Sequence, residues 1–469
     1  PKPQQVTWGS QRFNLDQSFH VVLSDLPDTR AHKAVSRFLR RFNDRTHLMT
    51  RIDPARKSGD IQGVSLDINY QRVGNLLPGE DESYELNVTG DRVTLTAITD
   101  LGVIYGLETF LQLVSSDSQG NYIPGVSIKD RPRFPWRGLL IDVCRHWSPI
   151  EVIKRNIDGM CMVKMNVLHL HLTEDQGFRI ESKKRPKLHL MGSNGEFYTQ
   201  EQMREIIRYA SDRGIRVVPE FDIPGHASSW MPGYPELASG PGPHQIERKF
   251  GVFDPTIDPT KKGTYKLLDC FLGEMADLFP DPYMHIGGDE NNGKQWDKNP
   301  RIQEFMRKHG IKDNHALQNH FNKKVMAILK KHGKKTIGWD EILQPGLPQD
   351  AVIQSWRGKE GLKEATTKGY QVILSNGYYI DLSQPTWKHY ANDPLPASLG
   401  LTPDQQRMVL GGEATMWAEL VTPETIDSRI WPRTAAIAER LWSDASVNDV
   451  MDMYQRLETV SIRLEEVGL

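Results

Sequence analysis

Cysteine is scarce in this sequence, and long apolar runs are absent. The 469 residues include three cysteines, Cys144, Cys161 and Cys270, too few and too scattered for a disulfide framework or a zinc site. We interpret them as small buried hydrophobic residues. No stretch of 18 apolar residues occurs, so the sequence predicts no membrane-spanning helix.

An excess of charge of either sign is also missing. The formal net charge is -2, so no overall field favours nucleic acid or an anionic membrane as a partner. With 38% hydrophobic and 25% charged residues, the composition is typical of globular domains. No signal peptide is visible in this chain, and we expect a secreted or periplasmic location.

The first 130 residues predict a small α+β domain. Residues 64–70, 84–88 and 92–98 alternate apolar and polar side chains, as strands do. Helical periodicity appears around residues 29–45 and 103–115. Residues 129–138 contain prolines and basic residues and predict a linker.

Residues 131–469 follow a different pattern, in which short apolar runs alternate with helical stretches. Such runs are typical of strands that are buried on both faces. Eight repeats of strand and helix predict an α/β fold, a (β/α)8 TIM barrel, with a final helix at about 447–466 packed outside. The runs are residues 138–143, 167–172, 216–221, 283–287, 335–339, 351–356, 370–374 and 409–417.

Carboxylates and aromatic residues gather where the predicted strands end. In a TIM barrel these ends form the catalytic face, together with long loops such as residues 222–260 and 375–408. A sugar stacks its C–H faces on aromatic rings and donates its hydroxyls to carboxylates, so this mixture predicts a carbohydrate site. The residues are Asp142, Arg145, His169, His171, Glu174, Asp175, Glu220, Asp222, His226, Asp289, Glu290, Trp339, Asp340, Glu341, Trp356, Tyr379, Asp381, Glu413, Trp417 and Glu419.

Simpler structural roles compete with this interpretation. Each tryptophan could be ordinary barrel core, Arg145 could form a surface ion pair, and Asp222 with His226 could stabilise a loop. The spacing of His169 and His171 is found in metal-dependent amidohydrolases, but such a site needs further histidines on the fifth and sixth strands. Those strands contain none, so we predict structural histidines and no metal.

Asp289 and Glu290 are adjacent, in the segment HIGGDE at residues 285–290. Glycosidases with two catalytic carboxyl groups hold them across the sugar, roughly 5–5.5 Å or 6.5–9.5 Å apart. Sequence neighbours are poorly placed for that arrangement, but they can approach the same side of a substrate. One can then protonate the leaving oxygen while the other holds a substrate group, and the nucleophile comes from elsewhere.

Several blocks in order resemble glycoside hydrolase family 20, the β-N-acetylhexosaminidases. They include RGLLIDVCRHW, NVLHLHLTEDQGFR, VVPEFDIPGHA, HIGGDE, GWDE, YYID and GGEATMWAE, within about residues 137–442. The first domain resembles the family's non-catalytic α+β domain. The resemblance implies an exo-acting, retaining enzyme without a cofactor, which removes terminal N-acetylhexosamine from oligosaccharides or glycoconjugates through an oxazolinium intermediate.

The resemblance also implies roles for individual residues. Glu290 would be the acid and later the base, Asp289 would hold the acetamido N–H, and Tyr379 would donate to the acetamido oxygen. The remaining implied roles are a tryptophan wall of the pocket (Trp339, Trp356, Trp417), hydroxyl contacts (Arg145, Glu174, Asp381, Glu419) and support for Glu290 (Asp222, His226).

Three alternatives stay open. Glu174 stands where many family members have aspartate, so the sugar contact could pass to Asp175. The enzyme could be a disaccharide-releasing relative similar to a lacto-N-biosidase. The barrel could also be a catalytically inactive sugar-binding protein, which the intact Asp289, Glu290 and Tyr379 oppose.

Overall fold

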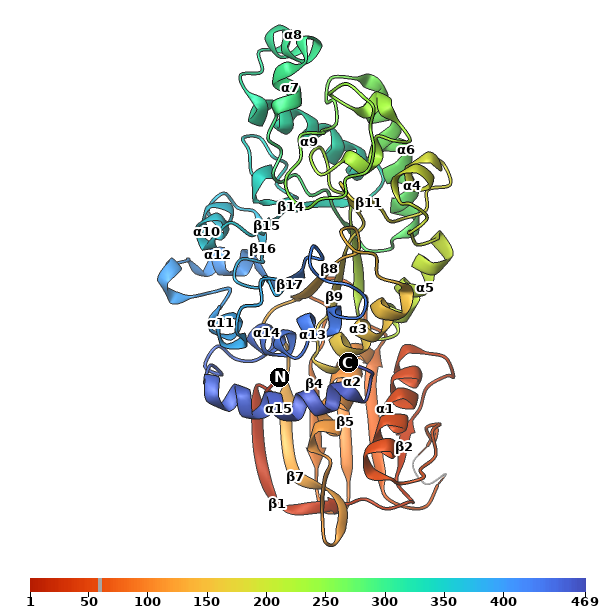
Figure 1. Ribbon diagram of the computed structural model, residues 1–469. Coiled ribbons are helices and arrows are strands. Elements are labelled where there is room, and N and C mark those ends of the chain that lie inside the picture. Colours follow the sequence, from red (N-terminus) through yellow and green to blue (C-terminus); the bar gives the residue numbers. More distant parts are fainter. Residues whose placement is uncertain (58–60) are drawn as a thin grey trace.

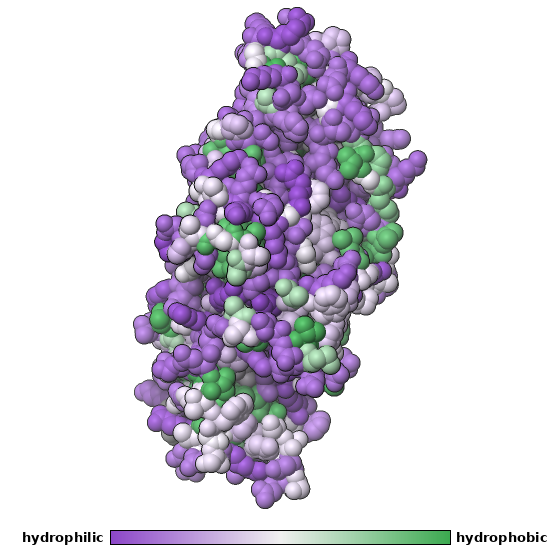
Figure 2. All heavy atoms as spheres, turned by 90° about the vertical axis from the view of Figure 1, so that its left-hand side faces the viewer, coloured by the Kyte–Doolittle hydropathy of each residue, from purple (hydrophilic) through white to green (hydrophobic). Residues whose placement is uncertain are grey.

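The computed structural model describes residues 1–57 and 61–469, which form a sheet domain and a barrel stacked on each other. Figure 1 shows the sheet domain, in red to orange, below the barrel, with the last helix, α15 (Val450–Glu465), lying across their junction. The described part of the chain contains no helix that is both long and apolar enough to cross a membrane. Figure 2 shows one face of the molecule, on which hydrophilic residues predominate and apolar residues form small separate groups.

The sheet domain has a seven-stranded sheet covered by two helices. The strand order is β1-β7-β4-β5-β3-β2, and β6 pairs with β7. Helices α1 (Arg30–Thr46) and α2 (Asp100–Leu113) pack together through Phe38, Phe42 and Phe110. The strands are β1 (Gln5–Asn14), β2 (His20–Leu23), β3 (Ser65–Arg72), β4 (Tyr84–Val88), β5 (Val93–Thr99), β6 (Ser115–Asp117) and β7 (Gly120–Asp130).

The three predicted strands and both predicted helices of this domain are present, whereas β1, β2, β6 and β7 were not predicted. Strand β1 is largely exposed and rich in polar residues, so its sequence carries little apolar alternation. The predicted linker at 129–138 is too long. Strand β7 continues to Asp130 and the first barrel strand begins at Trp136, so five residues connect them.

Eight parallel strands close the barrel, which confirms the predicted fold class. Seven predicted apolar runs contain one of these strands, and the first run, residues 138–143, overlaps β8, which begins two residues earlier. The strands are β8 (Trp136–Asp142), β9 (Val167–His171), β12 (Arg216–Glu220), β13 (Tyr283–His285), β14 (Lys335–Trp339), β15 (Val352–Ser355), β16 (Gln371–Leu374) and β17 (Val409–Met416). One bulky apolar side chain from each strand fills part of the barrel interior, namely Trp136, Val167, Val218, Tyr283, Ile337, Val352, Ile373 and Leu410.

Helices surround the barrel, and short elements occupy its loops. Helix α5 begins with a capping box, in which Thr199 and Gln202 bond each other's backbone. The helices are α3 (Ile150–Met162), α4 (Lys187–Gly192), α5 (Gln200–Ser211), α6 (Lys262–Leu278), α7 (Lys294–Lys298), α8 (Pro300–His309), α9 (Asn314–Lys331), α10 (Lys359–Thr367), α11 (Thr386–Ala391), α12 (Pro403–Met408), α13 (Ile426–Ile430) and α14 (Arg433–Trp442). The remaining short elements are strands β10 (Thr173–Glu174) and β11 (Gly177–Phe178), and the 3-10 turns η1 (Ser228–Trp230), η2 (Pro235–Leu237), η3 (Asp340–Ile342) and η4 (Ala397–Leu399).

Buried ion pairs join the sheet domain to the barrel. The ammonium of Lys164 is fully buried and donates to Asp130 at 3.0 Å, and Arg137 donates to Glu82 at 2.8 and 2.9 Å. A buried charge is tolerated only when it is paired, so these contacts fix where the two domains meet. Lys164 and Arg137 lie just before β9 and at the beginning of β8. The sheet domain therefore covers the N-terminal end of the barrel, and the C-terminal end is left for a site.

The cysteines differ in burial. Cys144 and Cys161 are buried, as predicted, whereas Cys270 is only partly buried; all three are unpaired.

Candidate active site

Two glycines shape the chain where it leaves β13. Gly287 and Gly288 have φ angles of 65° and 92°, which favour glycine. A Cβ on Gly287 would lie 1.8 Å from Asp222 Oδ1, and one on Gly288 would lie 2.7 Å from Ile342. Glu290 itself has a φ of 46°, an uncommon value that is often found at functional sites. The glycines therefore let the chain pass close to Asp222 and turn Asp289 and Glu290 into the barrel mouth.

Asp289 and Glu290 lie on the same side of the site, next to one imidazole. His226 Nε2 is 3.4 Å from Glu290 Oε2 and 3.9 Å from Asp289 Oδ2. The Asp289 side chain is 14% exposed and that of Glu290 is 39% exposed, so Glu290 reaches further toward solvent. The two carboxyl groups are therefore placed for different contacts with one substrate.

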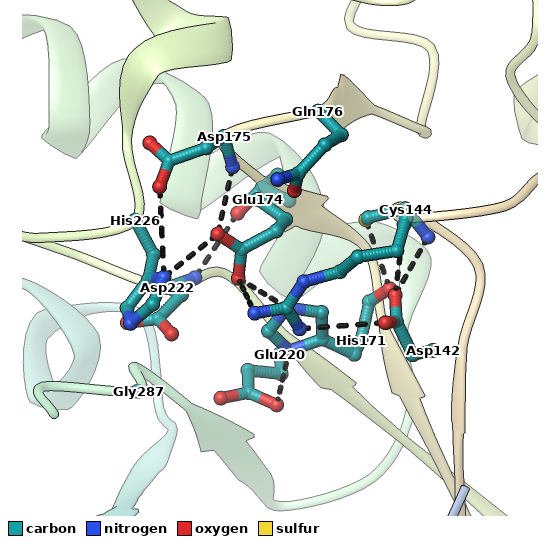
Figure 3. Close-up of polar contacts among 12 residues, drawn as sticks. Asp142, Cys144, His171, Glu174, Asp175, Gln176, Glu220, Asp222, His226 and Gly287 are labelled. Atoms are coloured by element: carbon teal, nitrogen blue, oxygen red, sulfur yellow. Dashed lines mark hydrogen bonds and ion pairs between the residues drawn. The ribbon is translucent and has the colours of Figure 1, made fainter. Parts of the chain in front are cut away.

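His226 is held from behind by Glu174. Its Nδ1 donates to Glu174 Oε1 at 2.7 Å, and the other oxygen of Glu174 pairs with Arg145 at 3.0 Å and with His171 Nε2 at 3.1 Å (Figure 3). Burial alone lowers the pKa of His226, but Glu174, Glu290 and Asp289 outweigh burial and raise it well above its usual value. The surrounding acids therefore favour the protonated form of the His226 imidazole.

This arrangement argues against a direct sugar contact by Glu174. Its side chain is 1% exposed, and the backbone N–H of Asp175 donates to it at 2.8 Å in addition to the partners above. Asp175 is buried too and accepts from the backbone N–H of Ser228 at 2.9 Å. Glu174 and Asp175, which follow β9, thus lie beneath the site, where they position other groups.

Asp222 lies beside Asp289 rather than Glu290. It is buried, and its Oδ1 accepts the N–H of Gly288 at 3.1 Å. Burial and the charge of Asp289 raise the pKa of Asp222 well above its usual value, and burial also raises the pKa of Asp289. The two neighbouring carboxyl groups therefore resist being ionised at the same time.

His226 has the opposite effect on Glu290. Its hydrogen bond and positive charge lower the pKa of Glu290, so the imidazole is the partner that more readily holds the proton of this pair. An acid catalyst must carry that proton when it meets a leaving group. A bound sugar that displaces water from half-exposed Glu290 would favour its neutral form, which moves the proton back.

Four aromatic residues form a continuous wall at the mouth. Trp339 lies 5.8 Å from Trp417, Trp417 lies 6.3 Å from Tyr379, and Tyr379 lies 6.5 Å from Trp356, measured between ring centroids. Two of the indoles are fixed by acids: Trp339 donates to Glu220 at 2.9 Å and Trp356 to Glu341 at 3.2 Å. The predicted tryptophans and tyrosine thus come together from four strands.

Arg145, Asp381 and Glu419 mark another edge of the mouth. The guanidinium of Arg145 lies over the Trp417 ring at 5.2 Å and pairs with Asp142 at 3.3 Å, with a side chain 10% exposed. Arg145 is therefore not a surface ion pair. Burial, followed by the charge of Glu419, raises the pKa of Asp381 to about 7, and burial also raises the pKa of Glu419. Protonation of either acid relieves the repulsion between them, and both can accept hydrogen bonds from sugar hydroxyls.

Two acids of the site had no predicted role. Glu341 holds Trp356, and burial together with the charge of Asp289 raises its pKa to about 7. Glu220 holds Trp339 and His171 from inside the barrel. Both residues were recognisable as strand-end acids, but sequence position alone does not show which partner an acid reaches.

Several of these groups have the composition of a metal site. Donor atoms of His226, Asp289 and Glu290, for example, lie within 4.8 Å of one another. In each such cluster the histidines already pair with acids, as His226 does with Glu174 and His171 does with Glu220. That the site needs no metal stays a prediction.

The chain is similar to known proteins over its whole length. The pattern of glycosyl hydrolase family 20, catalytic domain, matches residues 134–445, and that of glycosyl hydrolase family 20, domain 2, matches residues 1–131. A beta-hexosaminidase of Porphyromonas gingivalis is 36% identical over all of this chain, which spans 63% of that protein's length. The human beta-hexosaminidase subunit beta is 38% identical, over 87% of this chain and 75% of the human protein.

Solved structures give the same result. An X-ray structure of a Flavobacterium johnsoniae chitobiase superposes with a TM-score of 0.96 at 49% identity, over 100% of this chain and 72% of that chain. A mutant Streptomyces plicatus beta-hexosaminidase in complex with its product GlcNAc superposes with a TM-score of 0.83 at 28% identity, over 99% of this chain and 94% of that chain.

Proposed function

This chain belongs to glycosyl hydrolase family 20, and from that premise we propose that its barrel removes terminal β-linked N-acetylhexosamine with retention of configuration. The substrate is an oligosaccharide or glycoconjugate with such a residue at its non-reducing end. The relatives' names, beta-hexosaminidase and chitobiase, support this substrate class. A secreted or periplasmic location is part of the same proposal.

The reaction has two steps at C1. First, the acetamido oxygen attacks C1 while the bond to the leaving oxygen breaks and Glu290 donates its proton to that oxygen. Asp289 accepts the acetamido N–H and offsets the positive charge of the oxazolinium ion, and Tyr379 donates to the acetamido oxygen. Second, water attacks C1, Glu290 takes a proton from it, and the ring of the intermediate opens. Holding the nucleophile within the substrate makes its attack effectively unimolecular.

The observation that carries the proposal is the shared position of Asp289 and Glu290. Both carboxyl groups approach one nitrogen, His226 Nε2, at 3.9 and 3.4 Å. One oxygen of each carboxyl group also lies within 4.8 Å of the other, which is closer than the roughly 5–5.5 Å spacing of an acid and a nucleophile across a sugar. A mechanism with both as acid and nucleophile across the ring is therefore disfavoured, and the substrate's own acetamido group fills the missing role.

Glu341 is the alternative protein nucleophile at this end of the barrel. Its pKa is raised to about 7 by burial and by Asp289, so a large part of it is protonated at neutral pH. Its Oε2 is also occupied by the indole of Trp356 at 3.2 Å. A nucleophile has to be ionised and free, so Glu341 fits the role of a wall support better.

No feature of this chain favours a catalytically inactive sugar-binding barrel or a disaccharide-releasing enzyme. The acid pair and Tyr379 of an active enzyme are all present in one site, which opposes a catalytically inactive barrel. Arg145, Asp381 and Glu419 gather at one edge, which suits the hydroxyls of a single terminal sugar rather than a disaccharide.

Proton NMR of the first-formed sugar tests the proposal. The expected product from a β-linked substrate is the β-anomer, because the acetamido oxygen and then water each invert C1 once. An initial α-anomer would mean a single inversion, and the oxazolinium route would have to be abandoned. Comparison with the matching glucoside, which lacks the acetamido group, should show very poor hydrolysis.

A further inference from the structure

Glu220 is a fully buried carboxylate at the end of β12, and its two oxygens face two different halves of the site. Oε2 accepts from His171 Nδ1 at 2.7 Å and lies 3.0 Å from His169 Nε2. Oε1 accepts from the indole of Trp339 at 2.9 Å and lies 3.2 Å from His285 Nδ1. The reaction described above assigns no step to Glu220.

The first arm leads from Glu220 to the acid. His171 bridges Glu220 and Glu174, at 2.7 and 3.1 Å, and Glu174 in turn holds His226 at 2.7 Å. His226 completes the chain at Glu290, 3.4 Å away. Figure 3 shows Glu220, His171 and Glu174 following one another beneath the mouth, with His226 at the far side of Glu174.

The second arm leads from Glu220 to the aromatic wall. Trp339 is 1% exposed, and Glu220 accepts the single hydrogen bond that its indole N–H can donate. Its ring packs 5.8 Å from that of Trp417, which lies next to Tyr379. The orientation of Trp339 thus sets the wall against which the acetamido group would lie.

Both arms require a carboxylate at this position. Burial alone raises the pKa of Glu220, but His285, His171 and His169 outweigh burial and lower it well below its usual value. An amide in its place would offer one accepting oxygen instead of two. It would also remove one of the two carboxylates, Glu220 and Glu174, that flank the buried His171, which is costly in a buried site.

We propose that Glu220 is a positioning residue that couples the two halves of the site, by holding the Glu174–His226–Glu290 chain through His171 and the acetamido wall through Trp339. The proposal rests on the proposed function. Glu220 touches no reacting atom, and its effect reaches the substrate through these two neighbours.

Glu413 offers a matched control. It is a fully buried glutamate in the same barrel, accepts from an indole, that of Trp136, at 2.9 Å, and pairs with His169 at 2.7 Å. Its other partner, Gln354, donates at 2.8 Å. Glu413 reaches the site only indirectly, through His169, which also lies 3.0 Å from Glu220. A merely structural contribution predicts similar effects of Glu220→Gln and Glu413→Gln.

The kinetic test compares these two variants on an aryl N-acetylglucosaminide and on an unactivated N-acetylglucosamine disaccharide. Glu220→Gln should lower kcat/KM for both, by about 10- to 100-fold, the effect of losing a charged hydrogen bond. It should also weaken a thiazoline mimic of the intermediate, because the wall is displaced. Glu413→Gln should lose thermal stability but keep kcat/KM and thiazoline affinity within about threefold of the parent.

The two arms separate by their dependence on the leaving group. His171→Asn should lower the rate on the disaccharide more than on the aryl glycoside, since the latter needs less protonation. Trp339→Phe should lower both rates equally and weaken the thiazoline. The double variant His171→Asn/Trp339→Phe then tests the coupling. If Glu220 couples the two arms, the fold-loss of kcat/KM in the double variant should be markedly smaller than the product of the two single fold-losses.

This double-variant comparison of His171→Asn and Trp339→Phe still tests the proposal if Glu220→Gln does not fold. Independent, multiplicative losses in His171→Asn and Trp339→Phe would overturn the proposal, as would equal kinetics of Glu220→Gln and Glu413→Gln. These outcomes are distinct from failure of the proposed function, in which the unaltered protein would release no N-acetylglucosamine.

Discussion

His226 lies between two glutamates, with Glu290 3.4 Å from one ring nitrogen and Glu174 2.7 Å from the other. Glu174 keeps the imidazole protonated, and the imidazolium lowers the pKa of Glu290. With Glu290 as the proposed acid, its proton would be shared with His226 rather than held by Glu290 alone. A bound sugar that excludes water would favour the neutral carboxyl group and so the return of the proton to Glu290.

Replacing His226 by glutamine should change the pH profile. In the parent, kcat/KM should fall on the alkaline side only when the pair loses its proton, above the usual histidine pKa because that pKa is raised. In His226→Gln, Glu290 must hold the proton itself, so the alkaline limb should move to lower pH. Activity should drop most at neutral pH and recover partly near pH 5. An unchanged alkaline limb would contradict storage of the proton on His226.

Glu290→Gln should remove most turnover and leave folding intact. General acid–base catalysis contributes about 10²–10⁴-fold. The Glu290 side chain is 39% exposed, and its buried neighbour His226 keeps Glu174 as a partner in the variant. The loss should be greatest on disaccharides and smaller on aryl glycosides with good leaving groups. Near-normal rates on disaccharides, with a normal melting temperature, would reject Glu290 as the acid.

Arg145→Ala should impair both catalysis and stability. Its guanidinium is buried against Glu174, Asp142 and the Trp417 ring, so its removal leaves acids unpaired. Breaking such a pair costs about 3–5 kcal/mol. We expect a large loss of kcat/KM and a lower denaturation midpoint, both measured on one sample. Arg155→Ala, which removes a half-exposed ion pair with Asp427, is the control and should leave kcat/KM unchanged.

Asp381→Asn should stabilise the protein at alkaline pH while it weakens sugar binding. The folded-state pKa of Asp381 is about 7, against 3.8 for the ordinary carboxyl. Between these values the folded state binds the proton that the unfolded state has lost, so this residue's contribution to stability falls as pH rises through the window. In thermal melts, the melting temperature of Asp381→Asn should rise relative to that of the parent as the pH increases from 4 to 8. Glu201→Gln, at a 72% exposed acid, should show no such trend.

Asp289→Asn should slow turnover and weaken a thiazoline inhibitor together. A neutral amide offsets less of the positive charge that develops on the acetamido group. Inhibition constants and kcat from the same preparation provide the measurement. Tight thiazoline binding by the variant would argue that Asp289 serves another purpose.

The sequence by itself determined the architecture. Eight apolar runs of strand length, separated by helical periodicity, are typical of a parallel sheet covered by helices, and eight such units favour the closed barrel that the structure has. It also determined which strand ends carry acids and rings, because these are local properties of the chain. The exposed strand β1 escaped prediction since its pairing with β7 is a long-range contact without an apolar pattern.

Only the tertiary structure decided what each acid does. Glu174 and Asp175 are neighbours of the same chemical type, yet one bonds His226 and Arg145 while the other bonds Ser228. The sequence likewise shows three similar acids at strand ends, Glu220, Asp222 and Glu341. Their roles differ because each lies within about 3 Å, the reach of a hydrogen bond, of different partners. Burial and neighbouring charge, which set the pKa of each group, arise from residues far apart in the sequence. They exist only once the barrel has closed.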